Sequence, residues 1–165
     1  MKQQVIVIHG GMTFATYEDY LASLRAFRVE SLDSLKMVSW KETLQDALGS
    51  DYEVLLLKMP NKVNAKYLEW KIWFEKFILL FNESVILVGH SLGGTFLAKF
   101  LAEEKFAKKI EAVFLVAAPY DIEGTDHSLA DFVVPQDLSR LAVLSPRVFL
   151  YGSDDDRVVP MRNLE

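Results

Sequence analysis

A serine stands between two glycines in the segment Gly89-His90-Ser91-Leu92-Gly93, directly after a run of apolar residues. The spacing G-x-S-x-G is typical of a nucleophile elbow, a sharp turn between a buried strand and a helix. Such a turn strains the serine backbone, and glycines two positions away leave room for the neighbouring chain. We therefore predict that Ser91 is a nucleophile for acyl transfer. The alternative is a glycine-rich turn in which Ser91 only caps a helix.

Acyl transfer also needs two N–H donors, which stabilise the negative charge that develops on the carbonyl oxygen. One is expected from Leu92, because the residue after the nucleophile begins a helix and its N–H is free. The second is expected from the turn His9-Gly10-Gly11-Met12, which follows another apolar run. We assign this donor to Gly11 or Met12, and an ordinary turn between a strand and a helix is the alternative.

Three consecutive aspartates, Asp154, Asp155 and Asp156, follow the last apolar run of the chain. A carboxylate at the end of a strand can orient a catalytic imidazole and stabilise its charged form. Residue chemistry does not choose among the three, and a solvated acidic turn or a helix cap is the alternative.

The turns that carry this chemistry follow apolar runs that are continuous rather than alternating. The expected strands are Val5–Ile8, Glu53–Lys58, Ser84–Gly89, Ile110–Ala117 and Arg147–Tyr151. Continuous runs separated by helix-length segments indicate a mostly parallel five-stranded sheet with helices on both faces. We expect one α/β domain over residues 1–165.

Helices are expected to begin at two capping boxes, in which a hydroxyl and a carboxylate cap each other's backbone N–H. The pairs are Thr16 with Asp19 and Ser39 with Glu42. A further helix is expected within residues 65–81, where aromatic residues recur at helical spacing. We interpret this aromatic face as a helix packed on the sheet rather than as a cofactor-stacking surface.

Composition excludes several other classes of function. The chain has no cysteine, which excludes disulfides and thiolate metal sites, and its net charge of −5 comes without a basic cluster for nucleic acid. No apolar run approaches the roughly 18 residues of a membrane helix, and no signal peptide is recognisable. Without a ligand-spaced metal cluster or a phosphate-binding glycine motif, we expect no metal and no cofactor. We expect a cytoplasmic protein.

These motifs together resemble the α/β-hydrolase superfamily. The His-Gly-Gly turn after the first strand, the Gly-His-Ser-Leu-Gly-Gly turn after the third and the spacing from Ser153 to Pro160 carry the resemblance. The small size is similar to the serine-hydrolase branch typified by the YdeN-like and retinoblastoma-binding-protein-like hydrolases. The resemblance implies Ser91 as nucleophile and sheet order 2-1-3-4-5 in a three-layer sandwich. It favours Asp156 as the acid, with Asp121 as the alternative.

The histidine of the family's triad is missing from its expected place. The triad follows the order Ser, Asp, His, but no histidine follows the last aspartates. His9 belongs to the oxyanion turn, and the side chain of His90 is expected to point away from its neighbour Ser91. His127 lies within residues 119–138, where relatives carry a short lid insertion, and it is the alternative base.

The last residues, 158–165, resemble the start of a helix, whereas the resembling family continues with a strand and a histidine-bearing loop. We therefore expect a chain that lacks this last portion, with residues 147–151 as an exposed edge strand through which a homodimer forms. The predicted function is a serine hydrolase of small esters, thioesters or amides, acting through an acyl-enzyme on Ser91 and inactive or weak in this chain. The alternative is a non-catalytic hydrolase-fold protein that binds a ligand or partner.

Overall fold

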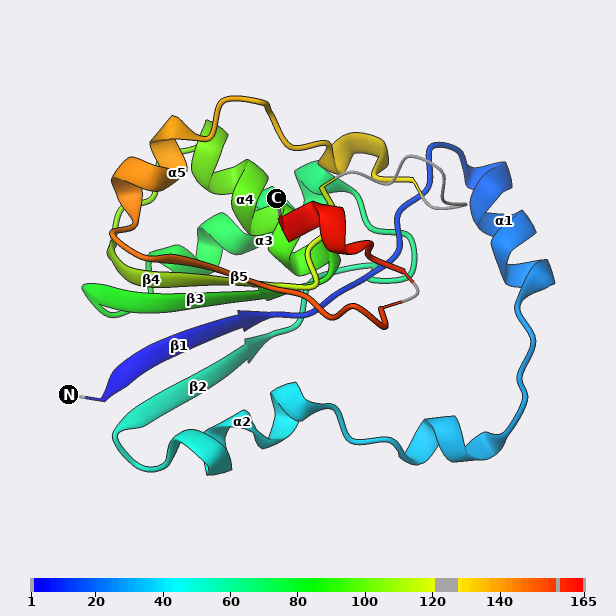
Figure 1. Ribbon diagram of the computed structural model, residues 1–165, viewed down its shortest axis with the longest axis horizontal. Helices are drawn as coiled ribbons and strands as arrows, with labels where there is room; N and C mark the ends of the chain where they lie inside the picture. The colour runs from blue at the N-terminus through cyan, green and yellow to red at the C-terminus, as the bar shows by residue number, and fades with distance from the viewer. Residues whose placement is uncertain (1, 121–127, 157, 165) are drawn as a thin grey trace.

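The structure is a computed structural model that describes residues 2–120, 128–156 and 158–164. Its strands form one sheet in the order β2-β1-β3-β4-β5, and every neighbouring pair is parallel (Figure 1). The strands are β1 (Gln3–Ile8), β2 (Tyr52–Leu57), β3 (Ser84–His90), β4 (Lys109–Val116) and β5 (Val148–Tyr151). The predicted order and parallel pairing are therefore confirmed.

Helices cover the two faces of the sheet unequally. They are α1 (Tyr17–Ala26), α2 (Trp40–Leu48), α3 (Tyr67–Ile78), α4 (Leu92–Glu103) and α5 (Ser139–Leu144), with short 3-10 helices η1 (Leu32–Lys36), η2 (Ala130–Phe132) and η3 (Met161–Leu164). Figure 1 shows α3, α4 and α5 on one face and α2 beside β2 on the other. Among the described residues, no helix is long and apolar enough to cross a membrane.

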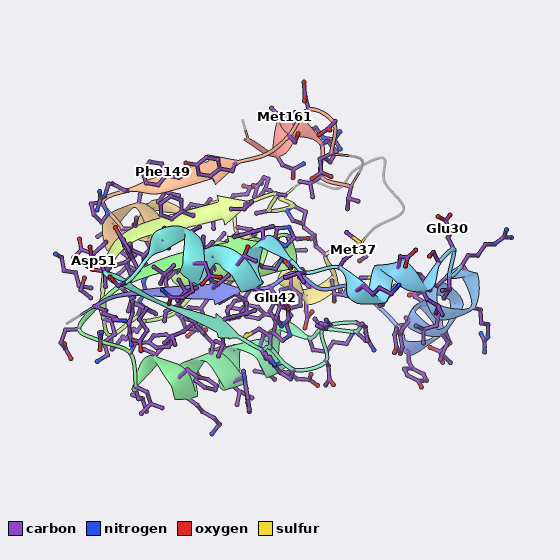
Figure 2. All side chains as sticks on the ribbon, turned by 90° about the horizontal axis from the view of Figure 1, so that it is seen from below. Glu30, Met37, Glu42, Asp51, Phe149 and Met161 are labelled. Atoms are coloured by element: carbon purple, nitrogen blue, oxygen red, sulfur yellow. The ribbon has the colours of Figure 1, made fainter. Side chains whose placement is uncertain are left out.

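Both predicted capping boxes are present, at the N-termini of α1 and α2. The two helices that begin at these capping boxes differ in how they pack against the sheet. In α2, Leu44 packs against the strand residues Val5 and Val7. By contrast, α1 buries none of its residues, and Figure 2 shows the segment that follows it, with Glu30, far from the sheet.

The larger core lies between the sheet and the helices α3 and α4. Trp70 and Phe74 of α3 are fully buried, and their rings contact Phe96 of α4 edge to face at 5.7 and 5.4 Å. The aromatic face predicted for residues 65–81 thus packs on α4 and the sheet, except that Trp73 is 39% exposed. Because Ser91 directly precedes α4, this core fixes the helix next to the candidate nucleophile.

The edge strand β5 is exposed along its whole length. Phe149 stacks on Phe114 of β4 with ring centroids 4.8 Å apart, yet it remains open to solvent at the sheet edge (Figure 2). An unpaired, apolar edge presents free N–H and C=O groups that pair readily with another strand.

We propose that β5 pairs with β5 of a second copy of the chain. The weight-average mass measured by light scattering should then rise toward that of a dimer as protein concentration increases. Leu150→Lys should prevent this rise, because a lysine on an edge strand opposes pairing. The control Leu79→Lys, at an exposed position after α3, should leave it unchanged. A wild-type monomer at every concentration would contradict the proposal.

Candidate active site

Ser91 occupies the turn between β3 and α4 with φ 52° and ψ −128°. A positive φ at a residue other than glycine costs on the order of 1–3 kcal/mol and persists only where surrounding contacts enforce it. Here the Ser91 N–H donates to the Val116 carbonyl at 2.8 Å, and the Ser91 carbonyl accepts from Gly94 N–H at 2.8 Å. The serine is thus held outside the helix and strand conformations, as its glycine spacing predicts.

The two glycines that flank Ser91 stand where α4 meets the strands. A Cβ at Gly89 would lie 2.5 Å from the Gly93 carbonyl oxygen, and one at Gly93 would lie 2.5 Å from the carbonyl oxygens of Ile8 and His9. These are backbone contacts shorter than any side chain tolerates. The glycines therefore allow the first turn of α4 to sit directly on the ends of β1 and β3.

The His9-Gly10-Gly11-Met12 turn lies against Ser91. A Cβ at Gly10 would lie 2.9 Å from Ser91 Cβ. Gly11 lines both cavities that open at Ser91. The structure therefore brings the predicted oxyanion turn and the predicted nucleophile together.

The two candidate donors of that turn differ in what their N–H groups do. Met12 N–H donates to the Lys62 carbonyl at 2.8 Å, so it is not free to bind an oxyanion. No acceptor for Gly11 N–H is found in the part of the chain that the structure describes. Leu92 is the first residue of α4, where an N–H has no acceptor within the helix. Gly11 and Leu92 are thus the residues whose N–H groups remain available.

His9 has both ring nitrogens engaged. Its Nδ1 lies 2.6 Å from the Gly10 carbonyl oxygen, and its Nε2 accepts from Met59 N–H at 2.9 Å. This pairing fits the neutral ring with its proton on Nδ1. The ring also contacts Trp70 edge to face at 5.8 Å. His9 therefore fixes the oxyanion turn and has no nitrogen free to accept the Ser91 proton.

His90 contacts α2 and lines one of the cavities beside Ser91. Its Nδ1 lies 3.4 Å from Lys41 Nζ, and its ring meets the Trp40 ring edge to face at 5.9 Å. Burial lowers the pKa of His90, the charge of Lys41 lowers this pKa further, and the charge of Asp156 partly offsets both. The lowered pKa favours the neutral form of His90.

The structure separates Asp156 from the other two aspartates of its run. Asp154 and Asp155 are exposed, whereas Asp156 is half-buried. Its Oδ1 accepts from Val158 N–H at 2.8 Å and from Val159 N–H at 3.0 Å, which fixes the carboxylate after β5. Bonds to the N–H groups of the second and third residues that follow are those of an acidic turn or a cap, the alternative stated for this run, so the role of Asp156 as the acid stays a prediction. The alternative acid Asp121 and the alternative base His127 lie outside the described residues.

Two cavities meet at Ser91 and Gly11. One, of about 700 Å³, is lined mainly by polar and charged residues, among them Ser39, Lys41, Glu42, Lys58, Lys62 and His90. The other, of about 730 Å³, is lined mainly by apolar residues, among them Met12, Phe14, Ala15, Ala22, Leu129 and Val158. Ser128 and Leu129 belong to the segment predicted as a lid, so its described part borders the site, while its lid function stays a prediction.

Residues 32–165 match a family model described as serine hydrolase. No curated protein sequence matches the chain. Among solved structures, the ydeN gene product from B. subtilis aligns with a TM-score of 0.64 and 19% identity, over 98% of this chain and 77% of that one. The pyrethroid hydrolase PytH aligns with a TM-score of 0.50 and 15% identity, over 98% and 81%. At such identities the likeness shows the fold alone.

Proposed function

Because the chain belongs to the serine hydrolase family and has the α/β-hydrolase fold, we propose that it is an esterase-like enzyme with Ser91 as its nucleophile. The observation that carries the proposal is the strained backbone of Ser91 at the junction of two cavities, against the Gly11 turn. The substrates are small esters, thioesters or amides, and no cofactor is required. The cysteine-free sequence suits a reducing compartment such as the cytoplasm.

The reaction proceeds through an acyl-enzyme. Ser91 Oγ bonds to the carbonyl carbon and loses its proton to a base, while the carbonyl oxygen takes the negative charge. The N–H groups of Leu92 and Gly11 stabilise this oxyanion. Collapse of the tetrahedral intermediate breaks the bond to the alcohol, thiol or amine, which leaves with a proton. Water then hydrolyses the acyl-serine in the same way and releases the acid.

The general base is the part of this mechanism that the described residues do not supply. His9 has no free nitrogen, and His90 lies beside the positive charge of Lys41, which disfavours accepting a proton. We therefore propose that the chain is a weak or inactive hydrolase, with Asp156 placed to orient an imidazole. His127 remains the alternative base.

The same observation favours a second candidate, a non-catalytic protein that binds a ligand in the cavities beside Ser91. The two candidates differ in whether the Ser91 hydroxyl reacts. A reactive fluorophosphonate distinguishes them, because it phosphonylates a serine that stands beside oxyanion donors and leaves ordinary serines unmodified.

We expect a fluorophosphonate to label the chain once, slowly, at Ser91, as located by peptide mass spectrometry. Backbone N–H donors still stabilise the phosphonyl oxygen when the base is absent. Ser91→Ala should abolish labelling. The control Ser50→Ala, an exposed serine before β2, should retain it. Absence of labelling, or equal labelling in Ser91→Ala, would favour the binding protein.

A further inference from the structure

Three lysines from three separate segments meet in the 700 Å³ cavity beside Ser91. Lys41 lies in the first turn of α2, Lys58 directly follows β2, and Lys62 lies in the loop before α3. One carboxylate, that of Glu42, lines the same cavity. The ionised side chains around this cavity therefore carry an excess of positive charge, although the whole chain has a net charge of −5.

Within the described residues, these three lysines form no ion pair. The ion pairs formed within the described residues use Lys36, Lys71, Lys99, Lys108 and Lys109. Oε2 of Glu42, the cavity's carboxylate, accepts from Ser39 N–H at 3.1 Å in the capping box. The positive charge in the cavity is thus available to a ligand.

Lys41 contacts the residue next to Ser91. Its Nζ lies 3.4 Å from Nδ1 of His90, the neighbour of Ser91, and 5.0 Å from the centre of the Trp40 ring. Burial lowers the pKa of Lys41, the charge of Glu42 raises it and the charge of Lys62 lowers it. An anion in the cavity would offset both the cost of burying the charge of Lys41 and the repulsion between the lysines.

The lysine-lined cavity borders Ser91, the proposed nucleophile, so its positive charge lies next to the place of reaction. Both cavities include Ser91 and Gly11, so a carbonyl carbon at Ser91 lies where the two cavities meet. One cavity is lined by lysines and the other mainly by apolar side chains. A substrate that fills both has an anionic end and an apolar end, with the scissile bond between them.

We propose that the substrate carries an anionic group, such as a carboxylate, which binds Lys41, Lys58 and Lys62 on one side of the bond that Ser91 attacks. The opposite side of the substrate is apolar. This inference rests on the proposed function, since it uses Ser91 as the reacting residue. It specifies the charge of the substrate, which the match to the serine hydrolase family does not indicate.

Boronic acids test the inference without requiring turnover. The serine oxygen bonds to boron, the hydroxyl proton is released to solvent, and the boron becomes tetrahedral and negatively charged. Phenylboronic acid reports on Ser91 alone. Its meta- and para-carboxy derivatives add an anion, and the matching carboxamides add similar volume without charge. Dissociation constants are measured by isothermal titration calorimetry.

In the wild-type chain, at least one carboxyphenylboronic acid should bind about tenfold more tightly than its carboxamide, as charge-assisted hydrogen bonds are stronger than neutral ones. The double variant Lys41→Gln, Lys62→Gln should reduce this preference to about twofold or less, and raised salt should weaken it. The control Lys105→Gln, an exposed lysine before β4 at the opposite end of the sheet, should keep it. Unchanged thermal unfolding midpoints show that the variants fold.

The outcomes separate this inference from the proposed function. If phenylboronic acid binds and Ser91→Ala prevents it, but no carboxylate derivative binds better than its carboxamide, the anionic substrate is wrong and the nucleophile stands. If phenylboronic acid does not bind, while benzoate binds and requires Lys41 and Lys62, the anion site stands and Ser91 as nucleophile is wrong. A carboxylate preference that survives the double lysine variant contradicts the assignment to these lysines.

Discussion

The chain is expected to hydrolyse p-nitrophenyl acetate about 10⁴ to 10⁶-fold more slowly than a hydrolase with a complete Ser-His-Asp triad. A serine hydroxyl is a weak nucleophile until a base takes its proton, and neither His9 nor His90 has a nitrogen suited to that task. The N–H groups of Leu92 and Gly11 remain in place. They and substrate binding should leave a residual rate about 10³ to 10⁴-fold above that in water.

The assay compares the chain with its Ser91→Ala and His127→Ala variants. The residual rate should change little in Ser91→Ala, because without a base it comes from the oxyanion donors and substrate binding rather than from the serine oxygen. It should be unchanged in His127→Ala. Rapid turnover that His127→Ala abolishes would show that His127 is the base and that the proposed weakness of the chain is wrong.

The sheet could be predicted from the sequence because its signal is local. Continuous apolar runs predict strands of a parallel sheet covered by helices, and β1 and β3 are largely buried in this way. The edge strand β5 has the same kind of run but is exposed. The capping box at Thr16 likewise places the start of α1. Whether a helix packs is not a local property. Nothing near Thr16 indicates that α1 buries none of its residues, because that depends on the path of the chain up to α2.

In the candidate site too, features set by nearby residues could be predicted, and a feature set by distant residues could not. The strained turn at Ser91 follows from the spacing of Gly89 and Gly93, which is read within five residues. The choice between Gly11 and Met12 could not be predicted, because the carbonyl that takes Met12 N–H belongs to Lys62, far along the chain.

The lysines of the charged cavity gave no signal in the sequence. Lys41, Lys58 and Lys62 come from three segments, and each alone is an ordinary surface lysine. Only the fold brings them to the same side of Ser91. A charged cavity built from separate segments can be recognised only in the tertiary structure.

Trp70→Ala is expected to lower the free energy of unfolding by about 3–5 kcal/mol. Trp70 is fully buried, and its ring contacts Phe96, Phe132 and His9. Its Nε1 also donates to the Pro60 carbonyl at 2.8 Å, which would lose its partner. Because the same ring supports His9, the loss should loosen the oxyanion turn as well as the core.

Trp73→Ala provides a matched control for this change. Trp73 lies on the same helix and donates its Nε1 to the Lys58 carbonyl at 3.0 Å, but its side chain is 39% exposed. Both variants therefore lose an indole and one hydrogen bond to a carbonyl, and they differ in the area that returns to water and in the cavity left behind. Urea denaturation should give a loss below about 2 kcal/mol for Trp73→Ala. Equal losses in the two variants would contradict the prediction, because burial of Trp70 would then contribute no more than the hydrogen bond that both residues share.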